Sequence, residues 1–145
     1  MANTIRTILT AKGRTVYTIA PTASVFDALR RMAEANVGAL VVLENDKLVG
    51  IISERDYARK IVLLGRSSPS TPVKDIMSTR VLCARPEQTV EDCLGMMTAK
   101  AVRHLPVLEH KEVVGIVSIG DLVKAIIGEQ QFVISQLENY IHGHA

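Results

Sequence analysis

Two segments of the chain place a serine three residues before an aspartate at the expected start of a helix. In residues 50–56 and 115–121, a glycine is followed three positions later by a serine and then, after another three, by an aspartate. An ionised carboxylate can accept hydrogen bonds from both vicinal hydroxyls of a ribose. A serine hydroxyl beside free helix N–H groups suits a ribose or phosphate oxygen. Ser53 with Asp56, and Ser118 with Asp121, are therefore candidate binding pairs.

The same pattern also has a purely structural interpretation. Aspartate is a preferred residue at a helix N-terminus, and a serine hydroxyl can satisfy a nearby backbone group without any ligand. A single Ser-x-x-Asp is more often of this kind. The whole segment occurs twice in register, each time after an expected strand pair, and this recurrence favours binding.

An internal repeat relates the two segments. Shifting the chain by 65 residues lays residues 21–59 on residues 86–124 with 15 identities in 39 positions. Upstream, residues 5–9 resemble residues 73–77 at a shift of 68. The chain therefore contains two copies of one unit. A lone unit of about 60 residues has a marginal core, so we expect the copies to bury their sheets against each other.

Hydrophobic spacing predicts the order strand, helix, strand, strand, helix in each copy. In the first copy these elements are residues 16–19, 25–33, 39–43 and 48–52, with a turn at 45–47, and a helix from Asp56. In the second they are residues 81–84, 90–99, 105–108 and 113–117, and a helix from Asp121 that runs to Tyr140, with a weak point at Gly128 and an apolar stripe over 132–141.

The predicted boundaries follow the repeat. Residues 1–65 form the first unit, residues 66–72 a linker, and residues 73–145 the second unit with a C-terminal helical extension. Gly65 is predicted to end the helix before the linker, because glycine is the usual residue after a helix C-terminus.

Composition excludes several classes of function. A net charge of +2 and only 3% aromatic residues argue against a nucleic-acid partner. No apolar run reaches the length of a membrane span and no signal peptide is evident, so we expect no membrane partner and a cytoplasmic location. The histidines lack a convincing ligand spacing, which predicts no metal site, and Cys93 is expected in the core. No phosphate-binding loop or hydrolase motif occurs, so we expect no enzyme.

The repeated segments resemble those of cystathionine-β-synthase (CBS) domains, and the chain resembles a tandem pair of them. The resemblance is carried by residues 37–42, 50–56, 73–77, 102–107 and 115–121. It implies a mixed α+β fold of two β-α-β-β-α units, packed through their sheets with pseudo-twofold symmetry and enclosing two clefts. It also implies an adenine nucleotide ligand: AMP first, with ADP, ATP, NAD/NADH or S-adenosylmethionine as alternatives.

The resemblance assigns roles to residues that match the family pattern. Asp56 and Asp121 would hold ribose, and Ser53, Ser118, Arg55, Arg103 and His104 would contact ribose or phosphate. The adenine or the cleft walls would be lined by Val16, Tyr17, Val37, Gly38, Ala39, Val81, Cys83 and Val102. The copies differ where Gly38 and Ala39 replace Arg103 and His104, and where Glu54 and Arg55 replace Ile119 and Gly120, so the clefts should differ in phosphate contacts.

The resulting expectation is a non-catalytic regulatory module that senses a nucleotide and acts on a protein target in trans. We expect a homodimer formed through the helices at residues 25–33, 121–127 and 132–141. The alternatives are a constitutive scaffold without ligand, a nucleotide-handling enzyme, and a DNA-binding protein.

Overall fold

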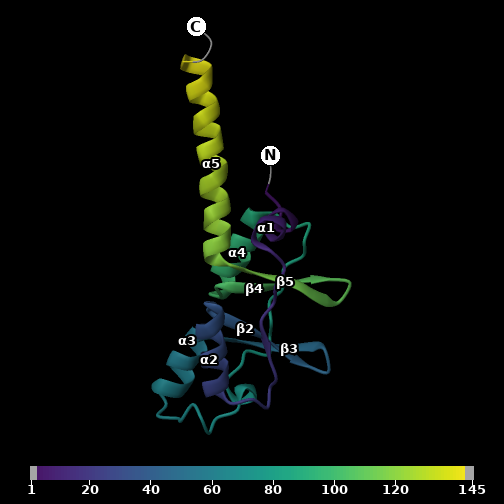
Figure 1. Cartoon of the computed structure of the whole chain (residues 1–145), viewed down its shortest axis with the longest axis vertical. Coiled ribbons are helices and arrows are strands. Elements are labelled where there is room, and N and C mark those ends of the chain that lie inside the picture. Colours follow the sequence, from purple (N-terminus) through teal and green to yellow (C-terminus); the bar gives the residue numbers. More distant parts are fainter. Residues whose placement is uncertain (1–2, 143–145) are drawn as a thin grey trace.

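Two α+β units are stacked one on the other in the computed structural model, which describes residues 3–142 (Figure 1). In chain order the elements are α1 (Ile5–Lys12), β1 (Thr18–Ile19), α2 (Val25–Ala35), β2 (Ala39–Glu44), β3 (Lys47–Ser53), α3 (Glu54–Tyr57), the π-helical turn η1 (Ala58–Val62), the 3-10 turn η2 (Val73–Asp75), α4 (Val90–Lys100), β4 (His104–Glu109), β5 (Glu112–Ser118) and α5 (Ile119–His142). The sheets run in the orders β1-β2-β3 and β4-β5. The predicted mixed α+β class with two repeated units is confirmed.

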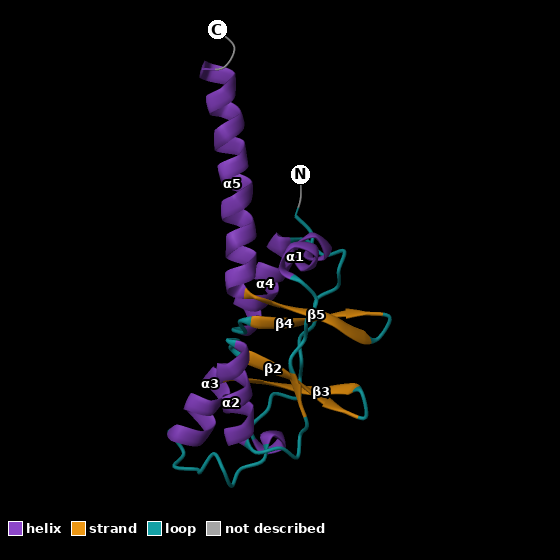
Figure 2. Ribbon diagram, in the orientation of Figure 1, coloured by secondary structure: helices purple, strands orange, loops and turns teal. Residues whose placement is uncertain are grey.

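The two hairpins share the same geometry. The turn residues Asn45 and Asp46 have positive φ values of 52° and 62°, and His110 and Lys111 have 52° and 66°. Two consecutive residues of this kind give the tight turn that matches the twist of antiparallel strands. Each ladder also has one register irregularity, at Val42/Leu43 and at the equivalent place in the second hairpin. Figure 2 shows both turns pointing to the same side, with helices on the other side.

The predicted strand at residues 81–84 is reduced to a single bridge, between Ala84 and Val107. This bridge is the counterpart of the pairing between Ile19 and Val42. In the first unit the pairing extends further, because the Val41 N–H donates to the Tyr17 carbonyl at 3.2 Å. Pro106 stands at the position equivalent to Val41 and has no N–H to donate. The shorter strand therefore follows from one proline.

Each segment that leads into a repeat packs on the other unit. Ile5, Ile8 and Leu9 of α1 belong to the core cluster that contains Leu105 and Val117 of the second unit. Likewise, Val73 and Ile76 belong to the core of the first unit. Figure 1 shows α1, at the start of the chain, beside the base of α5. The sequence division at residues 65 and 73 follows the repeat, whereas packing crosses it.

The glycine of each repeated segment makes this crossing possible. A Cβ atom at Gly50 would lie 2.6 Å from Met77 Sδ, and one at Gly115 would lie 2.6 Å from Leu9 Cδ2. Leu9 and Met77 are equivalent at the shift of 68 residues. The strand that carries the serine is thus contacted closely by the lead-in segment of the opposite copy.

The helices that follow the serines begin earlier than predicted. They start at Glu54 and Ile119, so Asp56 and Asp121 are the third helical residues rather than the first. Gly65 has a φ of 69° and its N–H donates to the Val62 carbonyl, which confirms the predicted helix end. The long final helix is also confirmed, but it continues through Gly128 without a break.

The C-terminal half of α5 extends away from the body of the molecule (Figure 1). Its large apolar residues are exposed, including Phe132 at 61%, Leu137 at 58% and Ile141 at 68%. Within residues 3–142 no helix is long and apolar enough to cross a membrane.

Candidate functional site

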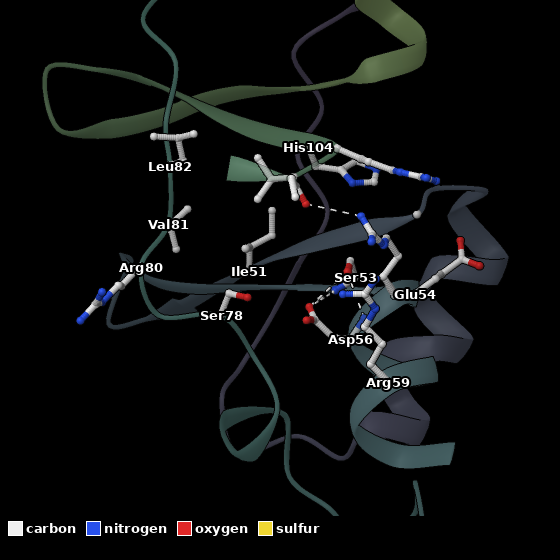
Figure 3. Close-up of a pocket in the computed structure, with 15 residues that line it drawn as sticks. Ile51, Ser53, Glu54, Asp56, Arg59, Ser78, Arg80, Val81, Leu82 and His104 are labelled. Atoms are coloured by element: carbon white, nitrogen blue, oxygen red, sulfur yellow. Dashed lines mark hydrogen bonds between the residues drawn. The ribbon is translucent and has the colours of Figure 1, made fainter. Parts of the chain in front are cut away.

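The two aspartates line two separate cavities between the units. The first, here called the Asp56 cavity, has a volume of about 400 Å³ (Figure 3). The second, called the Asp121 cavity, has a volume of about 440 Å³. Each cavity takes its serine and aspartate from one copy, and takes its opposite wall from the lead-in and the helix–strand turn of the other copy or its equivalent.

The two cavities are related by the repeat. Nine lining residues of one cavity fall on nine of the other at the shift of 65 residues. These pairs are Ile51/Ile116, Ser53/Ser118, Asp56/Asp121, Arg80/Thr15, Leu82/Tyr17, Ala101/Asn36, Val102/Val37, Arg103/Gly38 and His104/Ala39. The sequence repeat is therefore also a repeat of the cavity frame.

In the Asp56 cavity, the serine and aspartate form a reciprocal cap on α3. Asp56 Oδ2 accepts hydrogen bonds from the Ser53 N–H at 2.9 Å and from Ser53 Oγ at 3.1 Å. The Asp56 N–H in turn donates to Ser53 Oγ at 3.3 Å. Asp56 Oδ1 lies 3.4 Å from Lys60 Nζ. The structural interpretation of Ser-x-x-Asp is thus realised, and it occupies one carboxylate oxygen.

In the Asp121 cavity, a lysine from the other end of the chain reaches the aspartate. Asp121 Oδ2 accepts from the Ser118 N–H at 2.8 Å and from Lys12 Nζ at 2.6 Å. Lys12 Nζ also donates to the Ile116 carbonyl at 2.8 Å. Burial acts to raise the pKa of Asp121, but the hydrogen bonds from Lys12 and Ser118 and the charge of Lys12 leave it below its ordinary value. This carboxylate stays ionised because Lys12 is its counter-ion.

The cavities differ most in their cationic side chains. The Asp56 cavity is lined by Arg55, Arg59, Arg80 and Arg103, together with the carboxylates Glu54 and Asp56. In Figure 3, Arg59 and Arg80 lie on opposite sides of the view, with Asp56 between them. Among the described residues that line the Asp121 cavity, Lys12 is the one lysine or arginine.

Sequence reasoning found part of this cationic set. It placed Arg55 and Arg103 at a phosphate, and both line the Asp56 cavity. It interpreted Arg59 as part of a solvated helix face, and it did not consider Arg80 or Lys12. The shift of 68 residues that relates the lead-in segments also aligns Lys12 with Arg80, and this was the available indication.

Most of the predicted wall residues line a cavity. They are Val81 and Val102 for the Asp56 cavity, Tyr17, Val37 and Ala39 for the Asp121 cavity, and Gly38 for both. Val16 and Cys83 are not among the lining residues, and Leu82, which was not predicted, is. Side chains alternate along an extended segment, so Leu82 replaces its neighbour Cys83 at the wall.

The two cavities meet at Gly38 and His104, which line both. A Cβ atom at Gly38 would lie 3.3 Å from His104 Nε2, so the glycine makes room for the imidazole ring. Burial lowers the pKa of His104, and the charges of Lys12 and Arg103 lower it further, against the opposite influence of Asp121. His104 is therefore a partly buried, neutral side chain at neutral pH.

Comparison with known proteins gives the family of this cavity frame. The family described as CBS domain matches residues 12–63 and 73–128. The chain belongs to the CBS-domain family. Its two repeats are the two domains of a CBS pair, and the cavities lie between them.

Individual relatives agree with this assignment. The chain is 45% identical over 125 residues to the mitochondrial CBS domain-containing protein CBSX3 of Arabidopsis thaliana, covering 83% of this chain and 61% of that protein. A solved protein with CBS domains from Burkholderia ambifaria MC40-6 is 46% identical, with a TM-score of 0.86 over 88% of this chain and 96% of that one. The CBS domain pair of protein MJ0100, solved with 5′-methylthioadenosine and S-adenosyl-L-methionine, has the same fold at 24% identity, with a TM-score of 0.79 over 89% and 99% of the chains.

Other reactive groups of this CBS pair lie apart from the cavities. Cys93 is buried, as predicted, and burial together with the charge of Asp92 raises its pKa to about 11. Within residues 3–142, no group of three or more His, Cys, Asp or Glu side chains is placed to hold a metal ion. His144, considered as a tail histidine, lies outside the described residues.

Proposed function

We propose that this CBS pair is a non-catalytic regulatory module that binds an adenine nucleotide in its two cavities. The observation that carries the proposal is the Ser-x-x-Asp cap at the wall of each cavity. Capping by Ser53 occupies Asp56 Oδ2, while Oδ1 has only the longer contact of 3.4 Å to Lys60. A carboxylate has about four acceptor positions, so vicinal ribose hydroxyls can bind without dismantling the cap.

The lining of the Asp56 cavity favours a ligand that carries phosphate. Four arginines face two carboxylates there, and arginine forms bidentate hydrogen bonds with phosphate oxygens. AMP is our first candidate for the pair of cavities, followed by ADP and ATP, with NAD/NADH and S-adenosylmethionine as alternatives. The MJ0100 complex supports an adenosyl group in this fold.

Regulation would follow from where the cavities lie. Each is lined by both units, so a bound nucleotide links residues from the two halves and favours one arrangement of them. The changed surface would then act on a protein target in trans. Neither nucleic acid nor membrane is a partner in this proposal, and the cytoplasmic location stays a prediction.

A homodimer is part of the proposal. The exposed residues Val133, Leu137 and Tyr140 are spaced by four and three positions, which is the pattern of a helix seam. A helix with such a face is marginal in water without a partner. Light scattering should therefore give the mass of a dimer. The variant Val133→Glu/Leu137→Glu should give a monomer, and Gln131→Glu/Ser135→Glu on the same helix should not.

Calorimetric titration tests the nucleotide proposal. We expect AMP, ADP or ATP to bind the wild-type protein and to raise its melting temperature. Asp56→Ala and Asp121→Ala should each lose one site. Asp92→Ala is a matched control, because Asp92 forms the same reciprocal cap with Thr89 on α4 but lines neither cavity. Its caps cost about 1 kcal/mol of stability, as for the other two, without loss of a site.

The constitutive scaffold is the alternative that this titration distinguishes. A scaffold predicts a dimer that binds none of these ligands, with equal melting temperatures in their presence and absence. That result, obtained with folded wild-type protein, would reject the nucleotide proposal.

A further inference from the structure

Lys12 occupies the position at Asp121 that a ribose would need. Its ammonium lies 2.6 Å from Asp121 Oδ2, the oxygen that also accepts the Ser118 N–H. The side chains of Lys12 and Asp121 are 35% and 21% exposed, so the ion pair is partly shielded from water. The equivalent carboxylate, Asp56, has its nearest lysine 3.4 Å away, on the oxygen that the cap does not use.

The lysine comes from outside the helix that it caps. Lys12 is the last residue of α1 and is followed by Gly13, whose φ of 104° ends that helix. It reaches Asp121 across 109 positions of sequence, and it also donates to the Ile116 carbonyl at the cavity wall. A bound ligand must therefore compete with an intramolecular cation that is anchored by two hydrogen bonds.

We propose that Lys12 determines the ligand preference of the Asp121 cavity, by competing with ribose for Asp121 and releasing it to ligands that bring their own anion. This inference rests on the proposed function. An uncharged nucleoside would leave the displaced ammonium without a partner in a partly buried cavity. A nucleotide would offer its phosphate instead, so the ion pair is exchanged rather than lost. No other lysine or arginine lines this cavity in the described part of the chain.

The test compares AMP with adenosine when only the Asp121 cavity can bind. Asp56→Ala is the background in both proteins, and Lys12→Met is added to one of them. Methionine keeps most of the apolar stem and removes the charge. We expect adenosine to bind about 5-fold tighter once the competitor is gone, and AMP to bind no tighter, so the preference for AMP falls about 10-fold.

A second measurement reports on the ion pair without any ligand. The Asp121 carboxyl should titrate at higher pH in Lys12→Met than in the parent, followed by NMR of the carboxyl carbon. Arg14→Met is the matched control: it removes a positive charge from the same loop, but Arg14 lines neither cavity. It should leave both the AMP preference and the Asp121 titration unchanged.

The outcomes separate this inference from the proposed function. If AMP and adenosine bind but Lys12→Met leaves their ratio unchanged, the inference is overturned and the nucleotide proposal stands. If neither ligand binds the wild-type protein at any accessible concentration, both are overturned. If Arg14→Met changes the ratio as much as Lys12→Met, the effect is one of general charge and the specific role of Lys12 is rejected.

Discussion

The Asp56 and Asp121 cavities share a frame but differ in charge. The serine, the aspartate, the preceding isoleucine and a wall valine are identical in both. The differences lie at positions that point a charge into the cavity: Arg80 and Arg103 face Thr15 and Gly38 across the repeat. The repeat therefore preserves the groups suited to a ribose and varies those suited to a phosphate.

The difference teaches that one fold can offer two ligand preferences with few substitutions. The frame depends on hairpins, caps and glycine contacts that tolerate little change, because they set the backbone. The charged positions lie at the edges of the cavities and cost little to alter. If this is correct, exchanging edge residues should change ligand binding without changing stability, whereas altering frame residues should do the reverse.

The largest expected effect comes from making the Asp56 cavity resemble its partner. The double variant Arg55→Ala/Arg103→Ala removes arginines at two positions where the second copy has Gly120 and Gly38. Titration calorimetry in an Asp121→Ala background should show ATP binding weakened by about 30-fold or more, because two charge-assisted hydrogen bonds to phosphate are lost. Adenosine, which has no phosphate, should bind within about 3-fold of the parent.

A control for this exchange keeps the same change of net charge. Arg31→Ala/Arg85→Ala removes two exposed arginines that line neither cavity. Its ATP affinity should stay close to that of the parent. Equal weakening by the two double variants would mean that long-range charge, rather than the cavity, governs ATP binding.

A frame residue should affect stability instead, and unequally in the two copies. In Gly50→Ala the new methyl would meet Met77 Sδ at 2.6 Å and the Ser78 carbonyl oxygen at 3.0 Å, whereas in Gly115→Ala its close contacts are with the Leu9 side chain. A backbone carbonyl yields less easily than a side-chain end. Urea unfolding should show both variants destabilised by about 1–3 kcal/mol, with Gly50→Ala the more affected.

The helical glycine Gly95 provides the comparison for these two variants. A Cβ atom there meets nothing within 4 Å, so Gly95→Ala should raise the free energy of unfolding by about 0.5–1 kcal/mol. If Gly50→Ala and Gly115→Ala were also stabilising, the close approach of the lead-in segments would not be a constraint on the fold.

The frame could be predicted from the sequence, whereas the charged edges could only be predicted in part. The repeat, the alternation of apolar residues and the Ser-x-x-Asp caps are local patterns, so the hairpins, the helices and both aspartates followed from them. Lys12 and Arg80 reach the cavities from lead-in segments that cross to the other copy. That crossing is a tertiary contact, and no local pattern encodes which lead-in packs on which unit.

The wall at residues 81–84 shows the same limit at smaller scale. The pattern there predicted a strand with Cys83 at the cavity. The strand is lost because Pro106, 25 positions after Val81, cannot donate the hydrogen bond that Val41 donates in the first copy. A residue's own neighbourhood in sequence does not reveal the donor that its partner strand lacks.

A gain of binding is expected when the Asp121 cavity receives a charge from its counterpart. Thr15→Arg places arginine at the position equivalent to Arg80. In an Asp56→Ala background, calorimetry should show ATP binding about 3-fold tighter, since one exposed cation contributes up to about 1 kcal/mol. Thr10→Arg, on α1 and outside both cavities, should give no gain. Unchanged ATP affinity in Thr15→Arg would show that the phosphate lies away from this edge.

The smallest expected effect concerns His104, where the two cavities meet. Its counterpart in the first copy is Ala39, so only one half of the repeat carries a titratable group there. Burial, Lys12 and Arg103 keep the pKa of His104 below 6.5 in the folded protein, against Asp121. The folded state therefore binds fewer protons than the unfolded chain, and the free energy of unfolding should fall as the pH drops below 6.5 towards the folded pKa, by at most about 1.4 kcal/mol per pH unit for one group.

Urea unfolding at a series of pH values, in wild type and in His104→Gln, measures this contribution. Glutamine keeps a polar side chain but does not titrate, so the stability curve should be flatter just below pH 6.5. His110→Asn is the control, because this residue lies exposed in the hairpin turn with a φ of 52° that asparagine accommodates. A slope that persists in His104→Gln but disappears in His110→Asn would place the pH response in the hairpin turn and not where the cavities meet.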